Sequence, residues 1–233
     1  MTEIIPSILV ENFNELNEKL AKFINIAKTV QIDVCDGKFV SSTSWPMNTR
    51  DKESVRSILD EENGMPFWEQ LDFEFDLMVL NAHKQFDFFT QLGAKRIIFH
   101  LEAEEENEFK DFLESLDPYF KDNIDIGIAI NTTTDINKLN PFINYIDFIQ
   151  CMGIKHIGFQ GEPFDPKVLD QIKNIKIKYP EIKISVDGSV NKDTIQELIN
   201  AGADRLAIGS ALLQSYDIRE TYKEFENLEK LTI

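Results

Sequence analysis

Several features that would place this chain of 233 residues in a specialised class are missing. Its two cysteines, Cys35 and Cys151, fit neither a metal-ligand spacing nor a disulfide framework, and so few cysteines suit a reducing compartment. No run of about 18 apolar residues occurs, so we expect no transmembrane helix. Residues 1–3 lack the basic start of a secretory signal, and the apolar run Ile4–Val10 is too short for one. We therefore expect a cytoplasmic protein.

Basic residues are also scarce, with 24 Lys and Arg against 41 Asp and Glu, which gives a net charge of −17. Such an acidic chain is not expected to bind nucleic acid or an anionic membrane surface. Binding of a small phosphorylated ligand is compatible with this negative charge, because backbone amides alone can bind phosphate. What the chain has in quantity is apolar: 42% of its residues are hydrophobic and 18 are Phe, enough for a sizeable core.

Short apolar runs alternate with amphipathic segments along the whole chain, and no linker or low-complexity tract interrupts them. We therefore predict a single domain over residues 1–233. The predicted strands are Ile4–Leu9, Val30–Cys35, Leu71–Met78, Arg96–His100, Ile124–Ile130, Tyr145–Met152, Ile182–Val186 and Arg205–Ile208. The predicted helices are Asn12–Ile26, Asp51–Glu61, His83–Leu92, Glu104–Leu116, Asp135–Ile143, Asp165–Tyr179, Asn191–Ala201 and Asp217–Leu231.

This alternation is typical of βα units around a parallel sheet, so the fold class is α/β. Glycines in Leu92–Ala94 and Ala201–Asp204 stand just beyond a predicted helix and before a strand, where helices commonly end. An open doubly wound sheet would show the same pattern. Eight strands and eight helices in this length favour a (β/α)8 TIM barrel.

Two segments, Gln31–Gly37 and Ser185–Val190, are apolar runs that end on an acid and then break into glycine. Their acids, Asp33 and Asp187, could face each other across a pocket, remove a proton from one face of a substrate and return it on the other. An Asp after a strand also commonly caps a turn, and for Asp36 that interpretation is better. For Asp33 it is weaker, because a lone buried carboxylate needs a partner such as a metal, a substrate or another ionisable group.

Other groups are expected at the same strand ends, which form the active face of such barrels. They are Ser7, Cys35, Asp76, Met78, His100, Asn131 and Met152. The two methionines either fill core gaps or wall an apolar reaction chamber. His100 is either a satisfied core histidine or a substrate contact. We expect His83 on the surface and His156 in a loop, and assign neither a role.

Glycine-bearing segments after the last strands indicate a phosphate site. Gly188-Ser189 follows the seventh strand, and Gly209-Ser210 follows the eighth. Loops at these two places commonly bind phosphate through free N–H groups, although a single Gly-Ser pair is more often only a turn. The sixth loop, with Gly158 and Gly161, could close over the same site.

In their order, these motifs resemble the ribulose-phosphate 3-epimerases, a family of cytosolic phosphate-binding TIM barrels. The resemblance covers about Ile4 to Leu213. Its motifs are Pro6–Leu9, Asp33–Val40, Asp76–Val79, Phe99–Ala103, Ala129–Asn131, Met152, Gly158–Gly161 with Phe164, Val186–Asn191, Ala201–Asp204 and Gly209–Ala211.

The resemblance implies that Asp33 and Asp187 exchange a proton at C3 of a ketopentose phosphate, while a divalent metal polarises the C2 carbonyl. It implies the following substrate-binding residues: Ser7, Met78, His100, Met152, Gly158 and Gly161 around the sugar, and Gly188, Ser189, Gly209 and Ser210 at the phosphate. Family members are usually oligomeric, so a homo-oligomer is compatible with the chain.

Besides Cys35, which stands where a methionine is usual, the chain departs from the family pattern at the metal ligands and in the sixth loop. The family metal is typically held by two histidines and two aspartates, but Gln31 and Asp76 take the histidine positions here. The resulting oxygen-only set is Gln31, Asp33, Asp76 and Asp187, which favours Mg²⁺ or Mn²⁺ over Zn²⁺ if a metal is bound at all. The sixth loop carries Lys155–Gly158 instead of a proline-glycine run, with one residue more, and Gln160 instead of a glycine.

Three functions follow as hypotheses. The first is a 3-epimerase that converts ribulose 5-phosphate to xylulose 5-phosphate, or acts on a related ketose phosphate, through an enediolate. The alternative is a non-catalytic barrel that binds a sugar phosphate and has lost the metal site. A decarboxylase or aldolase ranks last, because the second strand lacks an Asp-x-Lys-x-x-Asp motif and a strand-end lysine.

Overall fold

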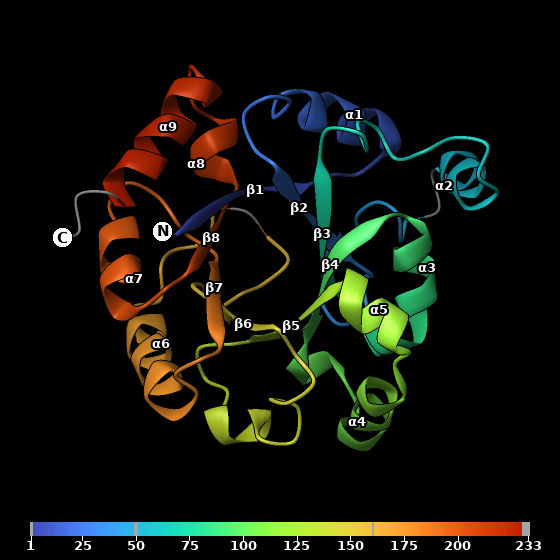
Figure 1. Ribbon diagram of the computed structural model, residues 1–233. Coiled ribbons are helices and arrows are strands. Elements are labelled where there is room, and N and C mark those ends of the chain that lie inside the picture. The colour runs from blue at the N-terminus through green and yellow to red at the C-terminus, as the bar shows by residue number, and fades with distance from the viewer. Residues whose placement is uncertain (1, 49–50, 160, 230–233) are drawn as a thin grey trace.

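Eight parallel strands close into a barrel in the computed structural model, which describes residues 2–48, 51–159 and 161–229 (Figure 1). Each strand pairs with the next along the chain, and β8 pairs with β1 to close the ring. The strands are β1 Glu3–Leu9, β2 Thr29–Cys35, β3 Asp72–Met78, β4 Ala94–His100, β5 Asp125–Ile130, β6 Phe148–Met152, β7 Lys183–Asp187 and β8 Arg205–Ile208. The expected (β/α)8 TIM barrel is confirmed.

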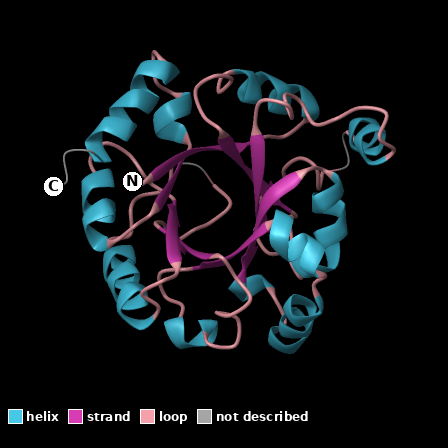
Figure 2. Ribbon diagram, viewed as in Figure 1, coloured by secondary structure: helices cyan, strands magenta, loops and turns pink. Residues whose placement is uncertain are grey.

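Helices form a layer outside the ring of strands (Figure 2). The α-helices are α1 Phe13–Ala21, α2 Lys52–Leu59, α3 Phe86–Gln91, α4 Glu106–Ser115, α5 Pro118–Asn123, α6 Lys167–Lys178, α7 Ile195–Ala201, α8 Ser210–Leu213 and α9 Ile218–Glu229. Short 3₁₀ turns are η1 Ala82–Gln85, η2 Leu101–Ala103 and η3 Ile136–Leu139. Within the described residues, no helix has the length and apolar character needed to cross a membrane.

Alternation along β2 shows how the sequence orients the site. All seven residues of this strand are buried, as expected for a parallel strand covered on both faces. Val30, Ile32 and Val34 belong to the large apolar core between sheet and helices. Since successive side chains point to opposite faces, Gln31 and Asp33 lie inside the barrel.

The observed elements differ from the predicted ones mainly around residues 118–147. The helix expected over Asp135–Ile143 is only the 3₁₀ turn η3, and β6 begins at Phe148 instead of Tyr145. The Asp135 carboxylate accepts a hydrogen bond from Asn137 N at 2.9 Å and caps a single turn. Pro141 has no N–H to continue it. The short helices α5 and α8 were not expected, and Leu231, the predicted end of the last helix, lies outside the described residues.

The helix end expected at Gly202 is confirmed, and the start of α1 is capped by a side chain. The Asn12 side chain accepts a hydrogen bond from Glu15 N at 2.9 Å at the start of α1. Gly202 follows α7 with φ of 115°, a left-handed conformation that suits glycine. In contrast, the expectation that His83 lies on the surface is wrong. Its side chain is buried, packs against Phe109 and Phe112, and its Nδ1 contacts the Glu104 carboxylate.

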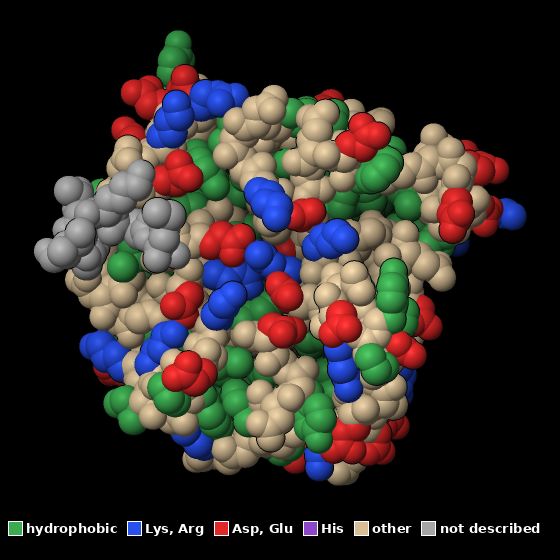
Figure 3. Space-filling view, viewed as in Figure 1, with side chains coloured by type: hydrophobic (Ala, Val, Ile, Leu, Met, Phe, Trp, Pro, Cys, Tyr) green, Lys and Arg blue, Asp and Glu red, His purple; other side chains and the backbone are tan. Residues whose placement is uncertain are grey.

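Paired charges fill the barrel interior near the strand N-termini. Arg205 and Glu74 form a buried ion pair across the barrel, and the Arg205 guanidinium lies 4.1 Å from the ring centroid of Phe148. Arg96 Nη1 lies 3.0 Å from the Glu3 carboxylate. Lys, Arg, Asp and Glu side chains also gather over the barrel centre on the face in view (Figure 3). The barrel interior near the strand N-termini is therefore held together by compensating charges instead of a purely aliphatic core.

Candidate active site

A cavity of about 250 Å³ lies at the C-terminal ends of the strands. It brings together the following residues that the sequence predicted for the site: Ser7, Asp33, Met78, Met152, Gly158, Gly161, Asp187, Gly188, Ser189, Gly209 and Ser210. Leu9, Ile154, Phe159, Glu162, Val190, Asn191 and Ala207 complete its lining. A larger groove is lined by the N-terminal ends of β3 and β4 with α3 and α5, and none of the predicted site residues lies there.

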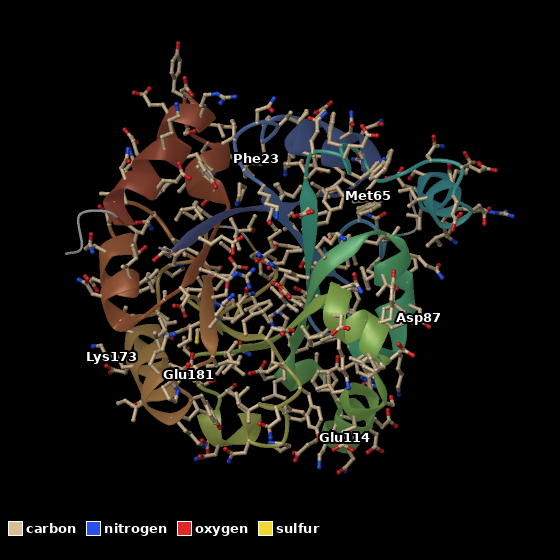
Figure 4. All side chains as sticks on the ribbon, in the orientation of Figure 1. Phe23, Met65, Asp87, Glu114, Lys173 and Glu181 are labelled. Atoms are coloured by element: carbon tan, nitrogen blue, oxygen red, sulfur yellow. The ribbon has the colours of Figure 1, made fainter. Side chains whose placement is uncertain are left out.

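Many oxygen and nitrogen atoms lie inside the ring of strands, whereas Asp87, Glu114 and Lys173 belong to the outer helices (Figure 4). The two predicted acids are in this interior, on strands that are not neighbours. Asp33 points inward from β2, and Asp187 is the last residue of β7.

The Gln31 amide joins the two acids. Its Nε2 donates one hydrogen bond to Asp33 Oδ1 and another to Asp187 Oδ2, both at 2.9 Å. The Ser7 hydroxyl donates to Asp33 Oδ2 at 3.0 Å. Both oxygens of Asp33 are therefore held by donors, which sets the orientation of this carboxylate at the floor of the cavity.

A third carboxylate, Asp76 on β3, completes an acidic cluster with Asp33 and Asp187. One oxygen from each of the three lies within 4.8 Å of the others. Burial and the charges of Asp187 and Asp76 raise the pKa of Asp33 well above its usual range. Burial and the Asp76 charge raise the pKa of Asp187 to about 7. Two carboxyl groups that hold a proton near neutral pH are suited to accept a proton from a substrate and to donate one to it.

His100 lies behind Asp76. Its Nε2 is 3.0 Å from Asp76 Oδ1, and both side chains are fully buried. Burial lowers the pKa of His100, but the Asp76 carboxylate, together with the charges of Glu102 and Asp187, outweighs burial, and the net pKa is raised. Gln31, Asp76 and His100 are not among the residues that line the cavity. A direct contact of His100 with substrate therefore stays a prediction.

The oxygen cluster fits a hard divalent cation by donor type. Gln31 Oε1 and Asp76 Oδ2 are buried and have no hydrogen-bond partner among the described residues. Together with Asp33 and Asp187, they would offer oxygen ligands of the kind that Mg²⁺ and Mn²⁺ prefer. The four predicted ligand residues thus lie together in the fold.

The sixth loop lies against two other loops over the cavity. Ser42 Oγ donates to Gly158 O at 2.7 Å, and a Cβ on Gly158 would come within 2.9 Å of Val40 and Ser42. The Ser189 hydroxyl donates to the carbonyl oxygen of Glu162, whose carboxylate lies 3.0 Å from His156 Nδ1. His156 is exposed in this loop, as predicted, whereas Gln160 lies outside the described residues.

Gly153 fixes the position of Asp187, although it is not among the residues expected at the site. Gly153 N donates to the backbone oxygen of Asp187 at 2.6 Å. A Cβ on Gly153 would overlap the backbone oxygen of Gly188, so only glycine lets these strand ends approach. The sequence signal for this close approach is a glycine directly after the sixth strand. Glu162 was missed as a cavity residue because nothing in its sequence context indicates which way a loop side chain points.

Solved structures similar to this chain share its fold. KGPDC from Streptococcus mutans aligns with a TM-score of 0.71 at 12% identity, over 99% of this chain and 98% of that one. The 3-hexulose-6-phosphate synthase from Salmonella typhimurium aligns with a TM-score of 0.70 at 12% identity, over the full length of both chains. At this identity the likeness supports the barrel and nothing finer.

Curated relatives give a more specific result. The ribulose-phosphate 3-epimerase of Eremothecium gossypii is 29% identical, over 93% of this chain and 88% of the relative. That of Escherichia coli K12 is 28% identical, over 96% and 94%. The expected enzyme class, an isomerase of the epimerase type, is thereby confirmed. The sequence model of the Ribulose-phosphate 3 epimerase family matches residues 3–213, and the chain belongs to that family.

Proposed function

We propose that the protein interconverts ribulose 5-phosphate and xylulose 5-phosphate, or a closely related pair of ketose phosphates, by proton transfer at C3. One observation carries this proposal: two carboxylates from non-adjacent strands of the barrel, Asp33 and Asp187, face one cavity and are joined by a single amide. The family membership and the names of the curated relatives give the substrate class.

In this reaction, one aspartate removes the C3 proton on one face of the sugar, and the other delivers a proton to the opposite face. The two acids must therefore start in different protonation states and exchange them in each turnover. Burial and mutual repulsion favour this arrangement, because they disfavour two ionised carboxylates at once. Met78 and Met152 wall the cavity beside the acids and limit the access of water to the reacting carbon.

Phosphate binding is assigned to the opposite wall of the cavity, where the loops after β7 and β8 meet. Gly188 and Ser189 both have positive φ, 104° and 55°, which turns the chain back directly after Asp187. Gly209 and Ser210 begin α8 beside them. Glycine at such positions lets backbone N–H groups approach an anion closely.

A divalent cation is part of the proposal, with Gln31, Asp33, Asp76 and Asp187 as its ligands. When bound, it supplies Lewis-acid stabilisation of the negative charge that develops on the substrate oxygens. The oxygen donor set favours Mg²⁺ or Mn²⁺ over Zn²⁺. We also propose a cytoplasmic location, since both cysteines are buried free thiols and a similar rice protein is named a cytoplasmic isoform. A homo-oligomer stays a prediction.

The test is exchange of the C3 hydrogen of ribulose 5-phosphate with D₂O, followed by NMR, together with metal analysis of the purified protein. We expect exchange and inversion in the wild type, and a loss on the order of 1,000-fold in Asp33→Asn and Asp187→Asn, as removal of a proton-transfer residue costs. Asp36→Asn is the matched control, because Asp36 caps a turn through Lys38 N and Phe39 N and does not line the cavity. Full activity in either site variant would rule out the two-aspartate mechanism.

The non-catalytic alternative has one observation in its favour: Gln31 and Asp76 stand where the family pattern has imidazoles. It requires that the wild type binds the sugar phosphate, holds no metal and exchanges no substrate hydrogen. Calorimetric titration with ribulose 5-phosphate beside the exchange experiment separates the two functions.

A further inference from the structure

Gln31 differs from an ordinary buried polar residue in what its amide contacts. The side chain is fully buried inside the barrel, on the same strand as Asp33. Its two amide hydrogens are divided between two acids: one hydrogen bond goes to Asp33 on β2, the other to Asp187 on β7. Because β2 and β7 are separated by β1 and β8, this contact spans the barrel instead of following the sheet.

The two acids depend on this amide to different degrees. Asp33 has a second side-chain donor, the Ser7 hydroxyl at 3.0 Å. For Asp187, Gln31 is the only side-chain hydrogen-bond donor among the described residues. Removal of the Gln31 amide therefore leaves Asp33 tied to another strand through Ser7, whereas Asp187 keeps only the backbone N–H of its own neighbour, Gly188.

A second buried glutamine provides the comparison. Gln150 on β6 is also fully buried within the barrel, but its Nε2 reaches only the sulfur of Met152, at 3.8 Å. Its Oε1 has no partner in the part of the chain that the structure describes, as is true of Gln31 Oε1. The two residues share type and burial, and differ in that Gln31 alone contacts the acids.

We propose that Gln31 is a positioning residue for the epimerisation: its NH₂ group fixes the two carboxylates relative to each other, and above all orients Asp187. This inference rests on the proposed function. It accounts for how a chain without the two imidazoles of the family pattern can still hold two acids at one cavity. Hydrogen bonds orient a carboxylate without a metal ion shared between the two acids. The arrangement therefore exists before any cation binds.

Gln31→Met removes both donors, together with the Oε1 ligand atom, while keeping the length of the side chain, and Gln150→Met is the matched control. We expect kcat to fall by about 100-fold in Gln31→Met, as for the loss of two hydrogen bonds to carboxylates, with KM changed by less than about threefold. In Gln150→Met, kcat should stay within about threefold of the wild type. The thermal midpoints of both variants show that they fold.

The partition between exchange and inversion gives a readout that a purely structural role would not change. With C3 exchange measured in D₂O from ribulose 5-phosphate and from xylulose 5-phosphate, one epimer gives up its proton to Asp33 and the other to Asp187. Gln31→Met should retain exchange from the first epimer and lose exchange from the second, with inversion lost from both. An equal loss from both epimers would overturn the proposal, and so would an undiminished kcat.

A direct structural measurement makes the result independent of turnover. Crystal structures of wild-type protein and of Gln31→Met, each dialysed against EDTA, should show the Asp187 carboxylate displaced in the variant and Asp33 retained by Ser7. An unmoved Asp187 overturns the positioning role even if activity is lost. If the wild type exchanges hydrogen with neither epimer, the proposed function fails, while the two crystal structures still decide whether Gln31 holds the acids.

Discussion

Nε2 of His100 lies 3.0 Å from Oδ1 of Asp76, and neither side chain is exposed to solvent. The pair places a titratable imidazole directly behind the acidic cluster of Asp33, Asp76 and Asp187. A buried carboxylate beside a histidine is compensated in charge, whereas one without a partner carries the full cost of desolvation. The His100–Asp76 pair thus lets a third carboxylate exist beside Asp33 and Asp187.

Replacement of His100 should show that the stability of the buried Asp76 carboxylate depends on it. In His100→Phe, Asp76 loses its partner, and we expect the free energy of unfolding to fall by about 2–4 kcal/mol in metal-stripped protein. Added Mg²⁺ should recover part of that loss, because a cation compensates the same charge. His83→Phe is the control, since His83 is also buried against a carboxylate, Glu104, but lies outside the cavity. Urea unfolding with and without Mg²⁺ measures both, and equal Mg²⁺ effects in the two variants would contradict the assignment.

The Arg205–Glu74 pair should matter for stability and not for catalysis. Both side chains are buried inside the barrel near the strand N-termini, so Glu74→Leu leaves the Arg205 guanidinium without its main partner. We expect a loss of about 3–5 kcal/mol in the free energy of unfolding, and a partial recovery in the double variant with Arg205→Leu. Urea unfolding curves measure the loss. Because the pair lies away from the cavity, kcat at room temperature should remain within about threefold of the wild type, and a larger change would show coupling to the site.

Stability should depend on pH through the acidic cluster. In the folded protein, burial and the Asp76 charge raise the pKa of Asp187 to about 7, against 3.8 for an unperturbed aspartate. Between these values the native state binds more protons than the unfolded state. The contribution of Asp187 is therefore fully present below about pH 4 and is lost as pH rises toward 7. The raised pKa of Asp33 acts in the same direction.

The measurement is urea unfolding of metal-stripped protein between about pH 4.5 and 8, with Asp187→Asn beside the wild type. We expect the variant to gain about 1–3 kcal/mol relative to the wild type across that range. Asp111→Asn changes the net charge equally at an exposed position of α4 and controls for the general repulsion in a chain of net charge −17. A parallel pH dependence in wild type and Asp187→Asn would disprove the assigned shift.

Gly153→Ala should damage the site more than the fold. The new Cβ would overlap the backbone oxygen of Gly188 and must push away the chain that carries Asp187 and Ser189. We expect a loss of about 1–3 kcal/mol in stability and a fall of about tenfold or more in kcat/KM. Gly127→Ala is the control, because its Cβ would overlap the Phe148 ring, deeper in the barrel. Equal kcat/KM in the two variants would show that Gly153 has no special role.

The fold and most of the cavity could be predicted from the sequence alone. β2 is a short run rich in β-branched residues whose two faces are both covered, and its residue pattern is readable without coordinates. The cavity lining followed from the same reasoning, since residues at the ends of parallel strands meet at one end of a barrel. Local signals failed where competing turn chemistry was stronger, as at Pro141 and Asp135, where a helix was expected and a 3₁₀ turn formed.

Only the tertiary structure decided how these groups are paired. The sequence placed Asp33 and Asp187 far apart along the chain and offered Gln31 as a metal ligand, but it could not show one amide donating to both acids. Nor could it show His100 behind Asp76, or His83 buried against Glu104, because these contacts join different strands and loops. The physical reason is that burial and strand order follow from local periodicity, whereas hydrogen-bond partners across a barrel depend on register and side-chain direction in three dimensions.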